Sequence, residues 1–415
     1  MGQRYAAPRS ILLLLLLLLS FAGATSDLYY SKLSGIIIPG FASTQLRAWS
    51  VLDCPFSPLD FNPLDSVWLD TTKVLSAVNC WLKCMLLDPY NQTDHPECKS
   101  RPDSGLSAIT ELDPGYITGP LSSVWKEWLK WCIEFGIEAN AIVAVPYDWR
   151  LSPSMLEERD LYFHKLKLTF ETTLKLRGGP SLVFAHSLGN NVFRYFLEWL
   201  KLEIAPKHYI QWLDEHIHAY FAVGAPLLGS TESVKATLFG FTFGLPVAEV
   251  GYYFAPSGKP YPDNWIITDV VYEYEGTLFT RSGNSISGNP GAASGDTTVA
   301  YNSLSWCKTW LGSKVNITRA PQAEHDGSDV QVHLDVEHIQ GEDIVPNMTR
   351  APRVKYMTYY EDSESIPGRR TAVWELDKAN HRNIVRSPVL MRELWLQMWH
   401  DIHPDASSKF VTKGK

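Results

Sequence analysis

Basic residues are scarce in this sequence, and the short motifs that bind nucleotides or zinc are missing from it. Lys and Arg number 37 against 45 Asp and Glu, which gives a formal net charge of −8. Proteins that bind nucleic acid need a basic surface to neutralise phosphates. The chain also has no P-loop, no G-x-G-x-x-G after a predicted strand, no C-x-x-C pair and no H-E-x-x-H motif. We therefore expect no nucleic acid partner, no cofactor and no bound metal.

Charged residues make up only 20% of the chain, whereas 45% of the residues are hydrophobic. This composition is typical of a protein with a sizeable buried core and is unlike that of a disordered chain. At about 150 residues per domain, the 415 residues allow two or three domains or one large α/β unit. The sequence shows no internal repeat.

Long apolar stretches are absent except for one near the amino terminus. Arg4 and Arg9 precede an uncharged run of 17 residues from Ser10 to Ser26, in which Ala22-Gly23-Ala24 resembles a cleavage site. The run is short for a membrane span. We expect a signal peptide over residues 1–24, with an uncleaved anchor as the alternative. The protein is then expected in the secretory pathway, in the endoplasmic reticulum lumen or at the microsomal membrane.

Glycosylation sequons and cysteines agree with that compartment. The sequons begin at Asn91, Asn316 and Asn347. Six cysteines would lie in a space that permits disulfides: Cys54, Cys80, Cys84, Cys98, Cys132 and Cys307. The first four predict a disulfide-stapled loop region over residues 50–100. Cys132 falls in a predicted amphipathic helix and is expected to be a buried free thiol.

Short apolar runs that end in turn residues predict strands buried in a parallel sheet. These runs are 35–38, 141–145, 181–185, 219–223 and 354–360. Between them lie helical patterns at 122–135, 155–176 and 188–203, and the glycine-rich stretch 283–295 predicts a flexible loop. Alternating strands and helices predict an α/β fold with a mostly parallel sheet, helices on both faces and a site at the carboxyl ends of the strands.

Ser187 is the candidate nucleophile. The segment Ala185-His186-Ser187-Leu188-Gly189 places it between a predicted buried strand and a predicted helix. A serine on such a sharp turn holds its hydroxyl exposed, near the N-terminus of the helix. Ala185 stands where the G-x-S-x-G motif has glycine, so the interpretation depends on the strand and helix around the motif. The alternative is a serine that caps an ordinary helix.

A catalytic serine needs a base that is oriented by an acid, and this architecture places them in the chain order Ser, Asp, His. His381 follows the last predicted strand and is the candidate base, with a surface histidine as the alternative. His186 is rejected because its side chain leaves the elbow in another direction. His400 and His403 are expected at a solvated helix end. Asp296, at the end of the glycine-rich loop, is the candidate acid.

Two other groups of charged residues invite a functional interpretation. One group supplies the rivals of Asp296 and could also be read as a metal site: Asp326, Asp329, Asp335 and Asp343 with His325, His333 and His338. Its spacing fits no known ligand pattern, and we expect a solvated acidic hairpin instead. The other group, Asp148 and Arg150, is expected to form a structural ion pair.

Six segments resemble the lecithin–cholesterol acyltransferase family of the α/β hydrolases, most closely its plant members. They extend over residues 34 to about 403. The Tyr-Asp-Trp-Arg and His-Arg-Asn-Ile-Val segments are specific, whereas the serine elbow alone is not. The segments are Ile36-Ile37-Ile38-Pro39-Gly40-Phe41, Pro146-Tyr147-Asp148-Trp149-Arg150, Ala185-His186-Ser187-Leu188-Gly189-Asn190-Asn191, Gly224-Ala225-Pro226-Leu227-Leu228-Gly229, Gly295-Asp296-Thr297-Thr298-Val299 and Asn380-His381-Arg382-Asn383-Ile384-Val385.

The resemblance implies a chemistry as well as a fold. In such a family a serine takes an acyl chain from a phospholipid at a membrane surface, and a sterol 3-hydroxyl then takes the chain from the serine. One alternative is a phospholipase A-type hydrolase, in which water replaces the sterol. Another is a lipid-associated protein with impaired catalysis. The resemblance implies a triad of Ser187, Asp296 and His381, with an oxyanion hole from the backbone N–H groups of Phe41 and Leu188.

The resemblance also implies a domain organisation. An α/β-hydrolase domain is expected over residues 25–403, with a tail over 404–415. The family has a small disulfide-closed loop at the lipid surface, which implies the bridges Cys54–Cys80 and Cys84–Cys98. The first bridge encloses apolar residues that are expected at the lipid interface together with Trp49: Phe56, Leu59, Phe61, Leu64, Val67 and Trp68.

The middle of the chain is shorter than in the family. Residues 245–249 run directly into 250–254, so the cap over the active site and one core strand are expected to be largely missing. Cys307 loses its implied family partner with that segment and is expected to be a free thiol. Without the strand, we expect Asp296 to be displaced from His381 and the activity to be low.

Overall fold

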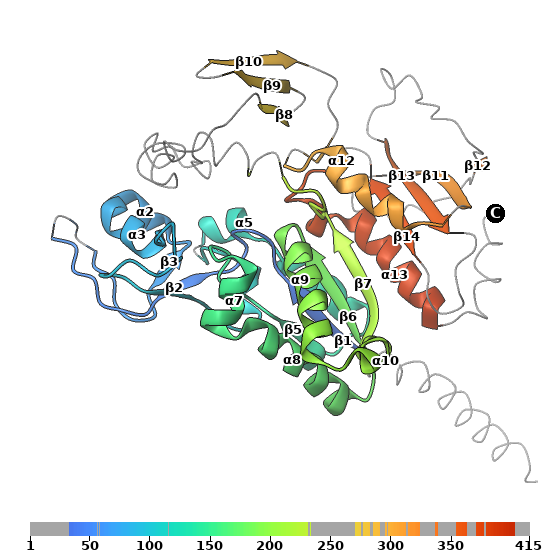
Figure 1. Cartoon of the computed structure of the whole chain (residues 1–415), viewed down its shortest axis with the longest axis horizontal. Helices are drawn as coiled ribbons and strands as arrows, with labels where there is room; N and C mark the ends of the chain where they lie inside the picture. The colour runs from blue at the N-terminus through green and yellow to red at the C-terminus, as the bar shows by residue number, and fades with distance from the viewer. Residues whose placement is uncertain are drawn as a thin grey trace, which may run out of the picture.

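A parallel four-stranded sheet forms at the first four predicted strand positions in the computed structural model (Figure 1). Its strands are β1 (Ser34–Ile38), β5 (Ile142–Ala144), β6 (Ser181–His186) and β7 (Ile217–Val223), in the order β5-β1-β6-β7. Every residue of β1 and β6 is buried, because these two strands lie inside the sheet between layers of helices. The predicted parallel sheet is therefore confirmed for these four runs.

The structure describes residues 33–402 except 56, 58, 115, 231–232, 234–269, 275–276, 283–284, 291–294, 297, 313, 324–336, 339–353, 363–370 and 377–378. Several predicted features lie outside these residues: the signal peptide, Asn347, His403, the tail over 404–415, and the acidic hairpin apart from β12 (Glu337–His338). None of the described helices combines the length and the apolar composition that a membrane crossing needs.

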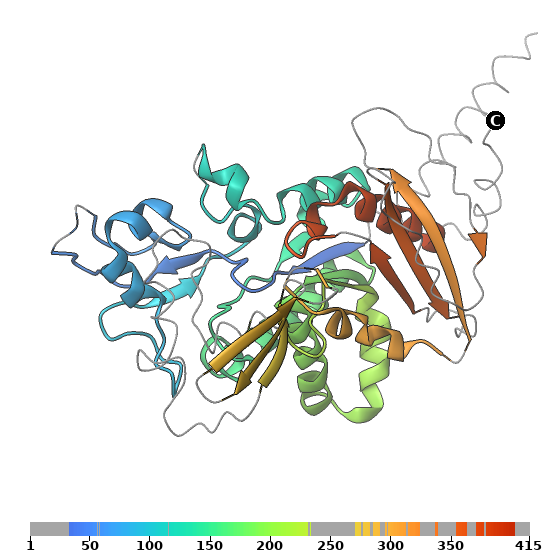
Figure 2. The same ribbon diagram turned by 90° about the horizontal axis from the view of Figure 1, so that it is seen from above.

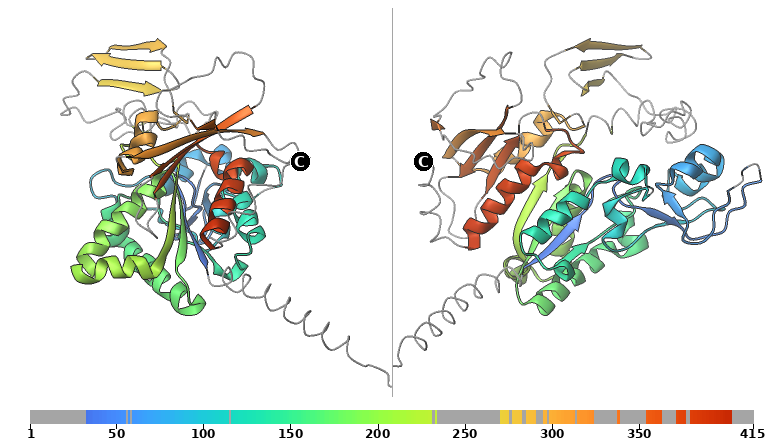
Figure 3. Two further views of the ribbon diagram at one scale, coloured as in Figure 1. Left: turned by 90° about the vertical axis from the view of Figure 1, so that its right-hand side faces the viewer. Right: turned by 180° about the vertical axis from the view of Figure 1, so that it is seen from behind.

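Helices cover both faces of the parallel sheet (Figure 3, left). On one face lie α8 (Tyr162–Arg177), α9 (Leu188–Glu203) and α10 (Pro206–His216). On the other lie α6 (Lys126–Glu134) and α13 (Pro388–Ile402). The bounds of α9 are those predicted, because one face of it carries apolar residues at helical spacing that are buried in the core: Val192, Phe193, Phe196 and Leu200.

The helix predicted over 155–176 consists of two helices. α7 (Pro153–Asp160) ends at Leu161, whose φ of 50° is left-handed, and α8 begins at the next residue. α7 also starts earlier than predicted, because Ser152 caps it and Pro153 occupies its first position. The break itself carries no glycine or proline, so no stop signal marks it in the sequence.

The region between β1 and α6 forms a small unit that two disulfides staple together. β2 (Leu46–Ala48), β3 (Ser66–Trp68) and β4 (Ser100–Pro102) pair in an antiparallel sheet beside α2 (Thr71–Ser76) and α3 (Val78–Met85). The bridges Cys54–Cys80 and Cys84–Cys98 have the implied pairing. As predicted, Cys132 is buried and free, and Cys307 is also free.

The fifth predicted strand does not belong to the parallel sheet, so this prediction was wrong. β13 (Val354–Asp362) pairs antiparallel with β11 (Val315–Ala323) and β14 (Ala372–Leu376), in a separate sheet of order β12-β11-β13-β14. Figure 2 shows this sheet at the end of the molecule opposite the disulfide-stapled unit. A short apolar run predicts a strand, but it does not reveal the direction of the partners.

The loop predicted over 283–295 was also wrong in part. Residues of that stretch form β10 (Ser285–Pro290), which pairs with β9 (Thr277–Ser282), and β9 pairs with β8 (Val270–Tyr274). These three strands make a separate antiparallel sheet. Among the described residues, no strand between β7 and Asp296 joins the parallel sheet.

Asp148 and Arg150 form the expected ion pair within a larger buried network. Asp148 Oδ2 lies 2.6 Å from Arg150 Nη2 and 2.8 Å from Arg159 Nη2. Arg150 also donates to the backbone carbonyls of Cys84 and Ser100, so the network joins the disulfide-stapled unit to the loop after β5. Burial opposes the charged form of Asp148, but the two guanidinium groups outweigh it and hold the pKa at about 2, below the ordinary 3.8.

We expect acid to remove the stabilising contribution of Asp148 as the pH falls from about 4 to about 2. The carboxylate contributes fully above its ordinary pKa of 3.8 and loses its contribution as the pH passes through the folded-state pKa of about 2. The size of this contribution is about 2 kcal/mol. The measurement is the free energy of unfolding of the wild type and of Asp148→Asn between pH 6 and pH 2.

At pH 6 the Asp148→Asn variant is expected to be less stable by about 3 kcal/mol, because two buried guanidinium groups lose the carboxylate that they share and keep only Asp94 and Asp160. The difference should narrow toward pH 2, where the wild-type carboxyl is itself becoming protonated. A difference that stays constant over the whole range would contradict the assignment.

Candidate active site

Ser187 lies between the last residue of β6 and the first residue of α9, where the sequence predicts a sharp turn. Its φ of 52° and ψ of −128° put a non-glycine residue in a sparsely populated, strained conformation. The Ser187 N–H donates to Val223 O at the end of β7 over 3.0 Å, so the neighbouring strand holds the turn. A strained serine on a strand-to-helix turn is the geometry of a nucleophile elbow.

Two glycines make room for this turn. A Cβ atom at Gly189 would lie 2.5 Å from Ile38 O, and one at Gly40 would lie 2.9 Å from Ser187 Cβ. Neither position accepts a side chain unless the backbone around it shifts. The loop after β1 and the first turn of α9 are therefore in direct contact on either side of Ser187.

The structure brings together the three predicted triad residues. Ser187 Oγ lies 2.8 Å from His381 Nε2, and His381 Nδ1 lies 2.5 Å from Asp296 Oδ2. His381 and Asp296 are each 7% exposed. Because the carboxylate can only accept, Nδ1 carries the imidazole proton, and Nε2 is left to accept from the serine hydroxyl. A neutral imidazole in this tautomer is what a general base for a serine nucleophile requires.

The expectation that Asp296 is displaced from His381 was wrong. Its position comes from a local turn, in which Asp296 Oδ1 accepts from the N–H groups of Thr298 (3.1 Å) and Val299 (2.8 Å). The His381 N–H also donates to Asp296 O over 2.8 Å. The acid is thus held by its own turn and by the base loop, and its placement does not need an adjoining strand in the parallel sheet.

His186 contacts the base loop rather than the serine hydroxyl. Its Nε2–H donates to the His381 backbone carbonyl over 2.9 Å. Burial, and after it the nearby His381, lower the pKa of His186 to about 3, so this imidazole is neutral at physiological pH. The contact agrees with the rejection of His186 as the base and gives it a supporting role that the sequence reasoning did not foresee.

Asn190 supports the elbow from the helix side and was also missed. Its Nδ2 donates to Ser187 O and Val223 O over 3.1 Å each, and its Oδ1 accepts from Tyr220 Oη over 2.7 Å. Asn190 is fully buried, so these hydrogen bonds satisfy a side chain that has no access to water. The one sign of this supporting role in the sequence was a polar residue in the first turn of a helix that was predicted to be buried.

The segment from Tyr147 to Arg150 positions the loop that follows β1. Tyr147 Oη donates to Pro39 O over 2.9 Å, and Trp149 Nε1 donates to Thr44 O over 3.1 Å. These hydrogen bonds hold both ends of residues 39–44, and the Phe41 ring packs edge-on against Trp149 with centroids 4.9 Å apart. The sequence predicted only an ion pair for this segment, whereas two of its aromatic residues fix the loop next to Ser187.

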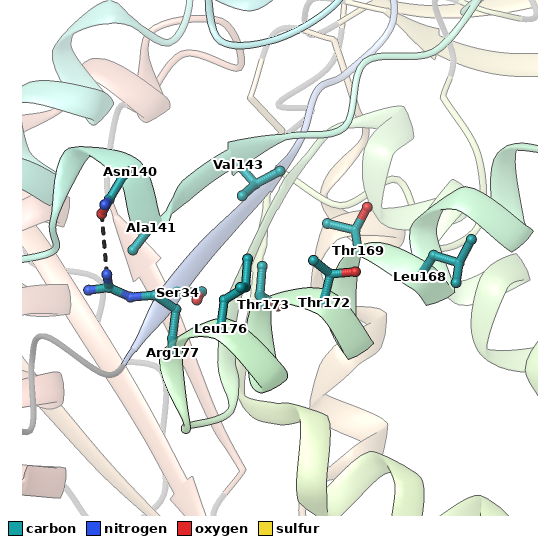
Figure 4. A pocket seen from close by; sticks show the side chains of 10 residues that line it. All are labelled: Ser34, Asn140, Ala141, Val143, Leu168, Thr169, Thr172, Thr173, Leu176 and Arg177. Carbon is teal, nitrogen blue, oxygen red and sulfur yellow. Dashed lines mark hydrogen bonds between the residues drawn. The ribbon is translucent and has the colours of Figure 1, made fainter.

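A cavity of about 320 Å³ lies near the amino ends of β1 and β5 (Figure 4). It is lined by the first residue of β1, by Val143 of β5, by the turn before β5 and by the second half of α8, including Ser34, Asn140, Thr173 and Arg177. No triad residue contributes to it. This cavity is therefore not where the chemistry of Ser187 takes place.

The rival acids Asp326, Asp329, Asp335 and Asp343 lie outside the described residues, and the side chain of His400 in α13 is not described either. Within the part of the chain that is described, no group of three or more His, Cys, Asp or Glu side chains is placed to hold a metal ion.

Comparison with known proteins gives a family match over most of the chain. Residues 63–250 and 247–338 match the lecithin:cholesterol acyltransferase family. A phospholipid–sterol O-acyltransferase of Arabidopsis thaliana is 59% identical, over 93% of this chain and 86% of that protein. A phospholipid:diacylglycerol acyltransferase of Schizosaccharomyces pombe is 30% identical over 51% of this chain, which corresponds to 32% of that protein.

A third relative, the lysosomal phospholipase A and acyltransferase of Bos taurus, is 29% identical over 51% of this chain and 52% of that protein. The Arabidopsis alignment extends over 543 residues, more than the 415 of this chain, so that protein has internal residues without a counterpart here. The family match also divides into two stretches that meet near residue 250. Both observations agree with a shortened middle.

Proposed function

The chain belongs to the lecithin:cholesterol acyltransferase family and is an O-acyltransferase; we propose that it transfers a fatty acyl group from a phospholipid to the 3-hydroxyl of a sterol. The observation that carries the proposal is the hydrogen-bonded series Ser187–His381–Asp296 at the carboxyl ends of a parallel sheet. The phospholipid donor and the sterol acceptor follow the name of the Arabidopsis relative, which is 59% identical.

In the first half of the reaction, Ser187 Oγ attacks an ester carbonyl of the phospholipid while His381 Nε2 takes the hydroxyl proton. The Asp296 carboxylate stabilises the imidazolium that forms. When the tetrahedral intermediate collapses, the carbon–oxygen bond to the glycerol backbone breaks and His381 gives its proton to the leaving oxygen. Lysophospholipid departs, and the acyl chain remains on the serine as an ester.

In the second half, the same residues act on the acceptor. His381 takes the proton of the sterol 3-hydroxyl, the sterol oxygen attacks the acyl-serine carbonyl, and the bond to Ser187 Oγ breaks as that oxygen regains its proton. The products are a steryl ester and the free enzyme. No net charge or electron is gained, so the reaction needs no cofactor.

Two backbone N–H groups are proposed to stabilise the oxyanion in both halves. The Leu188 N–H is the first of α9 and points from a helix N-terminus. The Phe41 N–H belongs to the loop that touches Ser187 at Gly40 and is held by Tyr147 and Trp149. Such donors are worth about 3 kcal/mol each in comparable enzymes, and the clamped loop fixes one of them in advance.

We also propose an α/β-hydrolase domain over 25–403 with a largely missing cap, a signal peptide over 1–24, a tail over 404–415 and passage through the secretory pathway. Two disulfides favour an oxidising compartment, and the sequon residues Asn91 and Asn316 are exposed.

Of the apolar residues expected at the lipid interface, Phe61, Val67 and Trp68 are buried instead. Interface contact is therefore proposed for those near them that are more than half exposed: Trp49, Val51 and Leu64.

A phospholipase A-type reaction, with water as acceptor, is the second candidate. The bovine relative, whose name combines phospholipase A and acyltransferase, supports it, because the same acyl-serine serves both reactions. The shortened middle favours this candidate further, since a reduced cap excludes less water from the acyl-serine. Impaired catalysis stays the third possibility, although the assembled triad argues against it.

The test is to incubate the purified protein with acyl-labelled phosphatidylcholine, with and without sterol, and to separate steryl ester from free fatty acid. Steryl ester that appears only with sterol supports the transferase, and free fatty acid unaffected by sterol supports the hydrolase. Reaction with an organophosphonate identifies the nucleophile by mass spectrometry of the modified peptide. A protein that forms neither product and takes up no label would contradict both catalytic candidates.

A further inference from the structure

Two arginines, Arg382 and Arg386, follow the base within five residues of the chain. Arg382 is the residue after His381, and its Nη2 donates to Leu121 O in α5 (Thr118–Ser122) over 2.6 Å. The chain segment just after α5 is close to the elbow, because the Trp125 ring packs edge-on against His186 with centroids 6.3 Å apart. Arg382 therefore reaches from the base loop to a segment that also packs against the residue before Ser187.

The positive charge at this place is not balanced. Within the described part of the chain, neither Arg382 nor Arg386, which ends η6 (Ile384–Arg386), forms an ion pair with a carboxylate. The two acids of the segment before α5 already have partners: Glu111 is paired with Lys126 at 2.6 Å, and Asp113 Oδ2 accepts from Thr71 Oγ1. Burial, and then the charge of Arg386, lower the pKa of Arg382. Arg386 follows four residues later, at the end of η6, so the segment after the base carries two positive charges that no described carboxylate pairs with.

We propose that Arg382 and Arg386 bind the phosphate of the phospholipid acyl donor; the inference rests on the proposed function. Arginine presents five N–H donors in a planar fork that suits phosphate oxygens. In Arg382, Nη2 donates to Leu121 O, which leaves Nη1 and Nε as donors for a ligand. In a glycerophospholipid only a few bonds separate the phosphate from the ester carbonyls. A phosphate site for the donor must therefore lie near the nucleophile, and Arg382 is the chain neighbour of His381, which contacts Ser187 Oγ.

The apolar surroundings fit the remainder of the same ligand. Leu121, whose carbonyl holds Arg382, has a side chain that is 71% exposed, and Ile117 at the start of α5 is 76% exposed. Exposed apolar side chains next to unbalanced guanidinium groups suit an amphipathic molecule better than a small soluble anion. The site would select a donor that carries a phosphate, whereas a sterol acceptor has none.

The test compares a phosphate-containing and a phosphate-free substrate in the same protein. The kcat/KM for phosphatidylcholine in non-ionic detergent micelles is divided by the kcat/KM for p-nitrophenyl butyrate. We expect Arg382→Gln and Arg386→Gln each to lower this ratio about tenfold, as the loss of one charge-assisted hydrogen bond does. Arg382→Lys, which keeps the charge but loses the fork, should give an intermediate ratio. Arg177→Gln removes an arginine at the opposite edge of the sheet and should leave the ratio unchanged.

A binding measurement separates this inference from the catalytic proposal. Dihexanoylphosphatidylcholine, below its micelle concentration, is titrated into the Ser187→Ala protein and followed by tryptophan fluorescence, with and without each arginine substitution. The dissociation constant should rise about tenfold in the Arg382→Gln and Arg386→Gln proteins. Because no turnover is needed, this readout decides the inference even if the wild type forms no product.

Three results would overturn the inference. An unchanged ratio and an unchanged dissociation constant would show that the arginines do not contact the donor. An equal loss of activity on both substrates, with unchanged binding, would show that they only maintain the base loop. Inorganic phosphate that binds as tightly as the lipid, and competes with it, would show a site for free phosphate rather than for a lipid headgroup.

Discussion

Ser187→Ala is expected to lower both steryl ester formation and fatty acid release by on the order of a million-fold. The acyl-enzyme ester cannot form without Ser187 Oγ, which lies 2.8 Å from the base, and both acceptors depend on that ester. Folding should be little affected, because the substitution removes one partly exposed hydroxyl and leaves the backbone turn in place. The measurement is turnover of acyl-labelled phosphatidylcholine by the purified variant.

Organophosphonate labelling provides the control for this prediction. The wild type should be modified at Ser187, the Ser187→Ala protein should take up no label, and both should unfold at similar temperatures. Ser76→Ala, which removes the hydroxyl of a serine in α2, should behave as the wild type. A Ser187→Ala protein that keeps most of its activity would show that another group is the nucleophile.

His381→Ala is expected to be about as damaging as Ser187→Ala, and the double variant should be no worse than either single one. The serine hydroxyl loses its proton to His381 Nε2 as it attacks, so neither group works without the other. Asp296→Asn should retain more activity, with a loss of about 10⁴-fold, because serine and imidazole still meet when the acid is neutral. The kcat of the four proteins, measured on one substrate preparation, checks this order.

The relative sizes of these activity losses test the hydrogen-bonded geometry of the triad as well as the identity of its residues. If Asp296 were a bystander, Asp296→Asn would retain full activity, and the short contact with His381 Nδ1 would have no catalytic meaning. Full activity in His381→Ala would move the base elsewhere, and His400→Ala would be the next variant to make. Glu375→Gln is the matched control. It removes a carboxylate outside the triad, on β14, the strand that precedes the base.

Local patterns predicted the parts of the fold whose surroundings leave little choice. The apolar runs of β1 and β6 are buried on both faces, so they read as uninterrupted hydrophobic strands. The serine elbow was predicted because a buried strand ends directly before Ser187 and an amphipathic helix begins directly after it. Once the serine was placed, the position after the last predicted strand pointed to His381 and the chain order required an acid before it. The family resemblance then implied Asp296 among several candidate acids.

Other features could not be predicted because they depend on contacts between distant segments. The run 354–360 forms a strand, but its antiparallel pairing with β11 and β14 follows from partners that the run itself does not specify. The end of α7 at Leu161 carries no breaking residue. The roles of Tyr147 and Trp149 were missed because their hydrogen bonds reach carbonyls more than 100 residues earlier in the chain.

The placement of Asp296 shows most clearly the difference between what a local sequence pattern predicts and what contacts between distant segments determine. From the shortened middle we expected the acid to lose its support, because the argument considered only the strand that would precede it. In the structure the acid turn is closed by Thr298 and Val299 and is bonded to the His381 backbone. Support from its own turn and from a loop 85 residues later replaces support from a neighbouring strand.

Side-chain type and apolar periodicity are local properties, so they were enough to identify the residues available for chemistry and the segments that would be buried. That Ser187, His381 and Asp296 meet within hydrogen-bonding distance, and that Arg382 reaches α5, follows only from the folded arrangement. Distances of this kind depend on how three loops close over the end of one sheet. That closure is set by the packing of the whole domain, which no short stretch of sequence contains.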